Sequence, residues 1–253
     1  MIHLDSHQFG RVAALFDDTL PNRPLLESVL ADRNPGWVFA DREEQPTAAV
    51  VVSLYSFTYV GGRPDRELLD FALARSAPAS KPRVICSPDE VSSPAGFIEG
   101  DPTIDRIEFT HLVPTWRAPV PLPDGMLLEP MTLGLLEQCL WKEDVLADSG
   151  SLERFLEIGL GICGVIDGRV VSEAYASIPG DRAYEIGAIV HPEFRRQRLG
   201  YVTCAALIDE CRRRGHGTIW SCDRTNEASA RLARALGYRR ERPYRFWLPS
   251  RPA

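Results

Sequence analysis

The sequence predicts an α/β protein that is divided into two parts. Segments typical of strands alternate with segments of helical spacing along the whole chain. Residues 113–125 interrupt this pattern with four prolines and a terminal Asp-Gly, so we expect this run to be an extended, irregular linker. A length of 253 residues also suits two small domains. We therefore expect an N-terminal α/β domain over residues 1–118 and a second domain over residues 119–253.

The first part has the pattern of a small mixed domain. Its clearest helix is residues 65–75, in which Leu68, Leu69, Phe71 and Ala72 form a broad apolar face. The other predicted elements are a helix at residues 9–16 and strands at residues 37–40, 48–60, 83–86 and 104–112. Because no motif in this part carries a chemical mechanism, we expect it to act as a scaffold or to shape a substrate site.

The second part has clearer turn and cap signals. Asp167-Gly168 separates two apolar runs and predicts a hairpin. Thr225 or Asn226 is expected to cap a helix that Gly237 ends. The predicted strands are residues 126–129, 161–166, 170–177, 184–190, 218–222 and 244–248, and the predicted helices are residues 133–141, 152–160, 199–213 and 227–236.

Composition narrows the kinds of partner. The formal net charge of −6 argues against broad binding to nucleic acid or anionic membrane, so we expect neither as a partner. The N-terminus shows no targeting pattern, and the longest apolar stretch, residues 48–62, is too short to span a bilayer. The six cysteines are scattered and form no metal-binding pattern. We expect a cytoplasmic protein with reduced thiols and no metal.

Residues 185–215 carry the chemistry. An apolar strand ends in a His-Pro pair, an arginine-rich loop follows, and Gly200 lies at the start of a helix. Unpaired N–H groups point outward at a helix N-terminus, and the helix dipole adds roughly half a positive charge there. Gly200 lets the backbone approach a bulky anion. Because Arg195, Arg196 and Arg198 add full charges, the segment predicts a diphosphate site.

This loop resembles the motif Val-x-Pro-x-x-Arg/Gln-x-x-Gly-x-Gly/Ala of the GNAT superfamily of N-acetyltransferases. The sequence reads Val190-His-Pro-Glu-Phe-Arg-Arg-Gln-Arg-Leu-Gly200, so the valine, proline, arginine and final glycine match. Arg198 replaces the first glycine, which indicates either a different backbone angle or an added side chain at the phosphate. Residues 226–238 resemble the Asn-x-x-Ser and Leu-Gly-Tyr signatures of the same superfamily. Four features together, which are residues 168–177, the strand of Glu185, residues 218–226 and the Leu-Gly-Tyr close, resemble a two-domain bacterial branch.

The resemblance implies an acyl-CoA N-acyltransferase fold, a mixed and mostly antiparallel sheet flanked by helices, in the C-terminal half. It also implies acetyl-CoA as co-substrate. The strands before and after the loop helix are expected to splay apart, with the pantetheine arm along Ile189 and Val190. The remaining implied contacts to coenzyme A come from Arg195, Arg196, Gln197, Arg198, Leu199, Gly200, Tyr201 and Asn226. His191 is expected either to touch phosphate or to be a solvated loop residue.

The implied reaction is direct attack of an amine on the thioester. An alkylamine has a pKa of roughly 10, so a base assists at neutral pH. Glu185 matches a position that often carries this base, and Glu173 is a second candidate. Many members protonate the leaving thiolate with a tyrosine one residue after Leu232, but this chain has Ala233 there. Tyr201, Cys222 and Tyr238 lie nearby in sequence and also suit core packing.

Three functions remain open from the sequence. The first is an enzyme that acetylates an amine of a small molecule or peptide. The second is a non-catalytic acyl-CoA-binding regulatory module, which Ala233 and Arg198 favour. The third is transfer to a hydroxyl or an aminoacyl ester. The sequence also leaves the oligomeric state open, with a homodimer as one arrangement.

Overall fold

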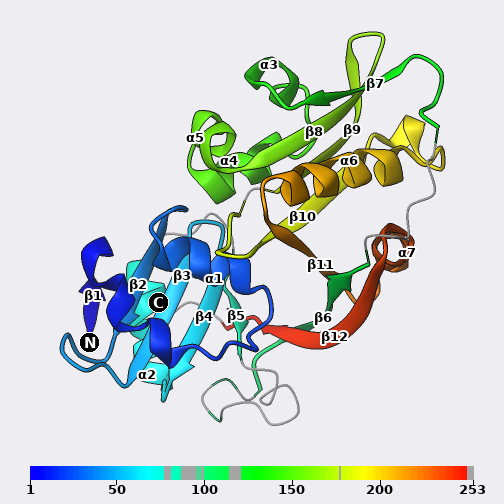
Figure 1. The fold of residues 1–253 in the computed structure, drawn as a ribbon. Helices are drawn as coiled ribbons and strands as arrows, with labels where there is room; N and C mark the ends of the chain where they lie inside the picture. The colour runs from blue at the N-terminus through cyan, green and yellow to red at the C-terminus, as the bar shows by residue number, and fades with distance from the viewer. Residues whose placement is uncertain are drawn as a thin grey trace. The chain divides into compact units, whose positions relative to one another are not determined.

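The chain folds into two compact units in a computed structural model that describes residues 1–76, 81–86, 96, 98, 100–113, 121–176 and 178–249. The first unit comprises Met1–Arg106 and Pro243–Ala253, and the second comprises Ile107–Arg242 (Figure 1). The predicted boundary between residues 118 and 119 lies outside the described residues. The C-terminal end of the chain joins the first unit, whereas the sequence assigned it to the second domain.

The first unit is built on an antiparallel meander. Strands β1 to β4 pair in sequence order, and β5 lies parallel to β4. The end of β12 pairs antiparallel with β5. The elements are β1 Ile2–Leu4, η1 Ser6–Arg11, η2 Ala13–Leu15, α1 Arg23–Leu30, β2 Gly36–Ala40, β3 Ala48–Ser53, β4 Phe57–Gly62, α2 Arg66–Arg75 and β5 Arg83–Ile85.

The second unit has the same kind of meander. Strands β7 to β10 pair antiparallel, and β11 lies parallel to β10. The elements are β7 Met126–Pro130, α3 Leu133–Leu136, α4 Lys142–Ser149, α5 Leu152–Ile158, β8 Leu160–Ile166, β9 Arg169–Ala176, β10 Ala183–Val190, η5 Pro192–Phe194, α6 Leu199–Arg213, β11 Gly217–Asp223 and α7 Glu227–Leu236. Two strands, β6 Thr103–Leu112 and β12 Tyr238–Trp247, contribute residues to both units.

The two units therefore share one topology. In each, helices separate the first strand from the second, and a helix connects the fourth strand to a parallel fifth. The connection into that helix differs in length. Six residues, 60–65, separate the last β4–β5 pair from α2, whereas twelve residues, 187–198, separate the last β10–β11 pair from α6. The second unit has the mixed, mostly antiparallel sheet that the resemblance implied.

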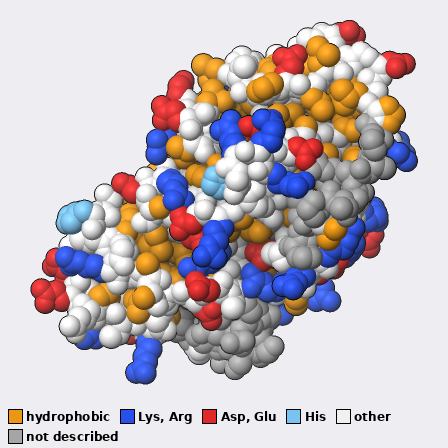
Figure 2. Space-filling view, in the orientation of Figure 1, with side chains coloured by type: hydrophobic (Ala, Val, Ile, Leu, Met, Phe, Trp, Pro, Cys, Tyr) orange, Lys and Arg blue, Asp and Glu red, His pale blue; other side chains and the backbone are white. Residues whose placement is uncertain are grey.

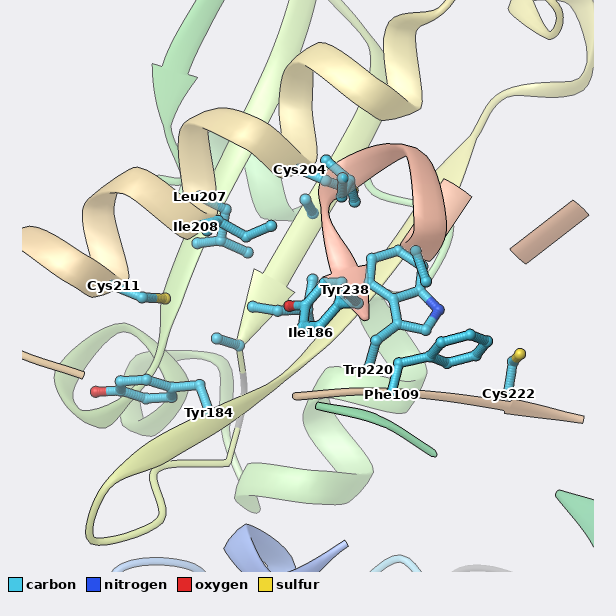
Figure 3. Close-up of a cluster of buried hydrophobic side chains, with 14 of the residues drawn as sticks. Phe109, Tyr184, Ile186, Cys204, Leu207, Ile208, Cys211, Trp220, Cys222 and Tyr238 are labelled. Carbon is cyan, nitrogen blue, oxygen red and sulfur yellow. The ribbon is translucent and has the colours of Figure 1, made fainter. Parts of the chain in front are cut away.

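The strands of the second unit present opposite faces to two groups of helices. Ala174 and Ile186 lie in a buried cluster with α6 and α7 side chains such as Leu207 and Ala233. Figure 3 shows Tyr184 and Ile186 of β10 close to Leu207 and Ile208 of α6 in this cluster. Tyr175 lies in a different cluster, with side chains of the α3–α5 region. Because side chains alternate along a strand, Glu173 and Tyr175 of β9 and the odd-numbered residues of β10 face the α3–α5 side. A register shift in β9 opposite Val165 reverses this order, so that Val170 faces α3–α5 and Val171 faces α6.

Several predicted elements are confirmed. Helix α6 spans Leu199–Arg213 as predicted, and Asp167 and Gly168 form the β8–β9 turn with φ of 49° and 76°. Asn226 caps α7, whose C-cap Gly237 has a φ of 106°.

Three predicted elements are wrong. Residues 9–16 contain parts of two short 3-10 helices, η1 and η2, rather than one helix. Residues 48–60 form two strands rather than one, because the Ser53 hydroxyl accepts hydrogen bonds from the N–H groups of Ser56 and Phe57 and stabilises a turn. Residues 133–141 do not form one helix. The backbone N–H groups of Leu140 and Trp141 donate to the Glu173 carboxylate instead of continuing the helix.

The surface carries charges of both signs. Figure 2 shows Lys and Arg side chains interspersed with Asp and Glu over the face that it draws. None of the helices in the described part of the chain combines the length and the apolar character that a bilayer crossing requires.

Candidate active site

Strand β10 pairs with a different neighbour along each half of its length. Its first half, from Ala183 to Ile186, lies parallel to β11. Its second half, from Gly187 to Val190, lies antiparallel to β9. Both β10 and β11 continue beyond the last pair of their register, Ile186 with Trp220. The two strands therefore part at Gly187, and β10 turns one backbone edge toward the opening.

The direction of the backbone hydrogen-bonding groups alternates along this second half. The His191 N–H donates to the Val171 carbonyl of β9 across 3.0 Å, which marks a hydrogen-bonded antiparallel pair. Ile189, two residues earlier, directs its N–H and C=O to β9 as well. Ala188 and Val190 direct theirs to the side that β11 has left. The Val190 backbone thus faces the opening, the Ile189 backbone faces β9, and Ala188 is a position that the sequence did not single out.

The loop between β10 and α6 presents its cationic side chains to solvent. Residues 195–198, which are Arg195, Arg196, Gln197 and Arg198, are exposed. Arg196 and Arg198 have left-handed backbone conformations, with φ of 64° and 62°. Arg198 therefore takes the conformation that glycine favours at this place. Within the described chain, neither Arg196 nor Arg198 forms an ion pair, so both guanidinium groups can meet an anion.

Helix α6 begins without a side-chain cap. Arg198 is its N-cap residue, and no side chain of the described residues accepts from the first N–H groups there. A Cβ on Gly200 would lie 3.2 Å from Val190 Cγ2 and 3.7 Å from Leu232 Cδ2. Leu199 is buried, and the half-buried Tyr201 contacts the clusters on both sides. Gly200 therefore joins the start of α6 to the parted end of β10 and to α7.

Glu185 lies on the opposite face of β10 from α6, near the point of parting. It is half-buried, and Gly187 is the next residue on the same face. A Cβ on Gly187 would lie 3.0 Å from both Trp141 Cζ3 and Tyr175 Cε2. The Trp141 and Tyr175 rings meet edge to face, with centroids 5.1 Å apart. The candidate base thus neighbours an aromatic pair that the sequence did not reveal.

Glu173, the second candidate base, is placed differently. It is 1% exposed, and both carboxylate oxygens accept backbone N–H groups, from Leu140 at 3.0 Å and from Trp141 at 2.8 Å. Burial raises the pKa of Glu173, and the hydrogen bonds from Trp141 and Leu140 oppose that rise. A carboxylate that is buried and engaged in this way supports local structure and lies out of reach of a solvent-borne amine.

The residues near α7 supply no obvious acid. Ala233 is completely buried. The Tyr238 hydroxyl lies 2.7 Å from Thr218 Oγ1 inside the core, and Cys222 is buried. Asn226 Oδ1 accepts from the Ser229 N–H at 3.1 Å, which assigns it the cap role and leaves the rest of its exposed side chain available.

Other polar groups of the second half are buried. His191 is 8% exposed, so the expectation of a solvated loop histidine is wrong. The six cysteines are buried and free, and burial raises the pKa of Cys211 to about 12. Among the described residues, no three His, Cys, Asp or Glu side chains gather as a metal site would require.

Two features lie together in this unit: β10 separates from β11 after Ile186, and α6 starts without a side-chain cap, next to exposed arginines. This combination is typical of the class of acyl-CoA-binding acyltransferases. The profile of the GNAT acetyltransferase family matches residues 13–247. The chain therefore belongs to the GNAT acetyltransferase family, whose enzymes use acyl-CoA, and it is an acyltransferase.

Relatives match nearly the whole chain or less than half of it. An uncharacterized N-acetyltransferase, YdfB of Bacillus subtilis, is 22% identical over 96% of this chain and 97% of its own. The [ribosomal protein bS18]-alanine N-acetyltransferase of Escherichia coli is 31% identical over 44% of this chain and 72% of its own.

Solved structures share the fold of the whole chain. A GCN5-related N-acetyltransferase-like protein from Streptococcus suis has a TM-score of 0.71 at 23% identity, covering 96% of this chain and 99% of its own. A tandem GNAT protein from the clavulanic acid biosynthesis pathway has a TM-score of 0.61 at 13% identity, covering 100% and 98%. The tandem protein agrees with the shared topology of the two units.

Proposed function

We propose that the protein is an N-acetyltransferase that moves the acetyl group of acetyl-CoA to an amine of a small molecule or peptide by direct attack. The observation that carries this proposal is the parting of β10 from β11 at Gly187, directly before the uncapped start of α6. No other part of the second unit combines open strand backbone with bare helix N–H groups and cationic side chains in the described residues.

The start of α6 holds the diphosphate of acetyl-CoA. The N–H groups of Leu199 and Gly200 lie in the first turn, where the helix dipole favours an anion, whereas the Tyr201 N–H donates to the Arg198 carbonyl across 3.0 Å. Arg195, Arg196, Gln197 and Arg198 surround the same turn with exposed donors.

The parted edge of β10 holds the pantetheine arm. The backbone groups of Ala188 and the N–H of Val190 are offered to its amides, and Ile189 adds side-chain contact from the same strand. The Val190 carbonyl accepts a hydrogen bond from Arg195 Nε across 3.3 Å. Asn226, at the start of α7, borders coenzyme A with the part of its amide that the cap leaves available.

Glu185 acts as the general base, directly or through a water. It takes a proton from the amine while the nitrogen lone pair forms a bond to the acetyl carbonyl carbon. The Ala188 N–H stabilises the oxygen of the tetrahedral intermediate, because it faces the opening. The C–S bond then breaks, and the thiolate leaves and is protonated by solvent. Solvent is the donor here because Ala233 stands where a tyrosine is common.

The acceptor is a primary amine. The family's acetyl transfer to nitrogen and the name of the Escherichia coli relative, an alanine N-acetyltransferase of a ribosomal protein, support small-molecule and peptide amines. A second candidate function is a non-catalytic acyl-CoA-binding regulatory module, which is favoured by Ala233 because an alanine cannot donate a proton to the leaving thiolate.

Calorimetry and thiol release test the proposal. Gly200→Val should abolish acetyl-CoA binding, because its branched side chain collides with Val190. Glu185→Gln should bind acetyl-CoA normally and lose about a hundredfold in kcat, the size of a typical general-base effect. Unchanged affinity in Gly200→Val would contradict the diphosphate site. Binding without thiol release over a broad amine panel would favour the regulatory module.

A further inference from the structure

Glu173 ties the α3–α4 connection to the central sheet. Its two oxygens accept from consecutive backbone N–H groups, those of Leu140 and Trp141. A buried carboxylate is costly unless it is fully hydrogen-bonded, and charge-assisted bonds to backbone N–H groups are among the stronger ones. The contact therefore fixes the backbone of these two residues relative to β9.

The hydrogen bond from the Trp141 N–H to Glu173 holds the backbone that carries the Trp141 ring. Trp141 is the N-cap residue of α4 and makes no capping bond with its side chain. Its backbone is held by Glu173, and its ring contacts Tyr175 and the bare face of Gly187. Gly187 is the first residue of β10 that β11 no longer pairs, and it is the neighbour of Glu185 on that face.

We propose that Glu173 is a positioning residue for the amine substrate. It holds the half-buried Trp141 against Gly187, so that the Trp141 ring, backed by the buried Tyr175, forms an aromatic wall on the face of β10 that carries Glu185. The inference rests on the proposed function, because it takes the face of Glu185 as the side from which the amine attacks. A wall of two aromatic rings beside one carboxylate fits a primary amine whose substituent is apolar.

Trp141 fluorescence tests the positioning step without any substrate. Subtracting the emission of Trp141→Phe from that of the wild type isolates the Trp141 signal, and the same subtraction is made in a Glu173→Gln background. Glutamine accepts one backbone N–H and turns an NH2 group toward the other, so the segment loosens. We expect the Trp141 emission to shift to longer wavelength in Glu173→Gln. Identical emission in both backgrounds would overturn the positioning role.

Kinetics with two amines tests the wall itself. Phenethylamine and ethanolamine are compared by coenzyme A thiol release in the wild type, Glu173→Gln and Trp141→Ala. We expect both variants to raise the KM for phenethylamine about tenfold, as loss of a supporting contact commonly does, and to change the KM for acetyl-CoA less than twofold. Phe155→Leu is the matched control, since Phe155 lies in the same core and beside Tyr175, whereas the Glu173 carboxylate is bonded to the backbone of Leu140 and Trp141.

The outcomes separate this inference from the proposed function. Equal changes for both amines, or equal effects of Phe155→Leu, would overturn the wall. A wild type that binds acetyl-CoA but acetylates neither amine would contradict the assignment of an apolar amine. A wild type that does not bind acetyl-CoA would contradict the proposed function, while the fluorescence comparison still decides the role of Glu173.

Discussion

Asp65 Oδ1 accepts a hydrogen bond from the backbone N–H of Leu68 across 2.8 Å and so caps α2 of the first unit. The corresponding helix of the second unit, α6, has Arg198 at its N-cap and no side-chain cap. The two helices occupy the same place in one topology, yet one start is filled by a carboxylate and the other is bare. An anion placed at α2 would meet the negative charge of Asp65 and would have to displace its hydrogen bond.

We predict that one chain binds one acetyl-CoA. The short connection before α2 has no arginine-rich loop, and Asp65 repels phosphate, so of these two helices α6 is the one that offers a site. Isothermal titration calorimetry of the full chain should give a stoichiometry near one, and Asp65→Asn should leave it unchanged. A second binding event in the wild type would contradict this reading of the first unit.

The Arg198 side chain should contribute to affinity through its charge. Arg198→Gly removes the Cβ, so the left-handed backbone conformation at this position loses its steric cost. Arg198→Ala keeps the Cβ and therefore keeps that cost. Because both remove the guanidinium group, we expect both to weaken acetyl-CoA binding about two- to fivefold, as loss of one exposed ion contact does. Arg198→Lys serves as the charge-preserving control. If Arg198→Gly binds as tightly as the wild type and Arg198→Ala does not, backbone shape is the relevant property.

Tyr238 should support the core and take no part in proton transfer. Its hydroxyl pairs with Thr218 Oγ1 where both residues are buried. Tyr238→Phe is expected to lower the free energy of unfolding by about 1 kcal/mol and to leave kcat unchanged. Adding Thr218→Val to Tyr238→Phe should recover part of that loss in a double-mutant cycle measured by urea denaturation. A tenfold loss of kcat without a stability change would assign Tyr238 to catalysis.

Asp41 should make the first unit sensitive to acid. Partial burial pushes the pKa of Asp41 up, but hydrogen bonds from Thr47 and Ala48, with Arg42 nearby, outweigh it and hold the pKa well below its usual range. The folded state thus favours the ionised form. This stability is complete above the unfolded pKa of about 3.9 and is lost as the pH falls toward the lower folded value.

The matching experiment uses Asp41→Asn. We expect this variant to be about 1–2 kcal/mol less stable than the wild type at pH 7, because charge-assisted hydrogen bonds that join β2 to β3 are weakened. The difference should shrink as the pH is lowered from 5 to 3 in urea-unfolding experiments followed by circular dichroism. A difference that is constant with pH would show that the charge of Asp41 does not contribute.

Local signals predicted the parts of the fold that local chemistry determines. Asn226 and Gly237 bound α7, and Asp167-Gly168 forms a turn, because cap and turn preferences act within a few residues. Local reasoning of the same kind predicted that backbone N–H groups at the start of α6 have no side-chain cap.

Contacts between distant residues explain what the sequence missed. Glu173 lies more than thirty residues after Leu140 and Trp141, so no local pattern reveals that it ends a helix there. The sequence predicted a last strand over residues 244–248, yet β12 runs from Tyr238 to Trp247, through Pro243. The sequence did not single out Ala188, because its proposed role depends on which backbone N–H and C=O groups of β10 face the side that β11 has left. Gly187 was the available signal for Trp141, since a glycine within a strand often marks a close approach.

The sharing of β6 and β12 between the units affects how the chain can be dissected. A fragment that starts at residue 119 lacks all of β6, including Phe109, which is fully buried among core side chains of the second unit. Such a fragment would expose that part of its core and would tend to aggregate. Truncations of this protein should therefore begin before Thr103, so that the acyltransferase half keeps the strand that completes its interior.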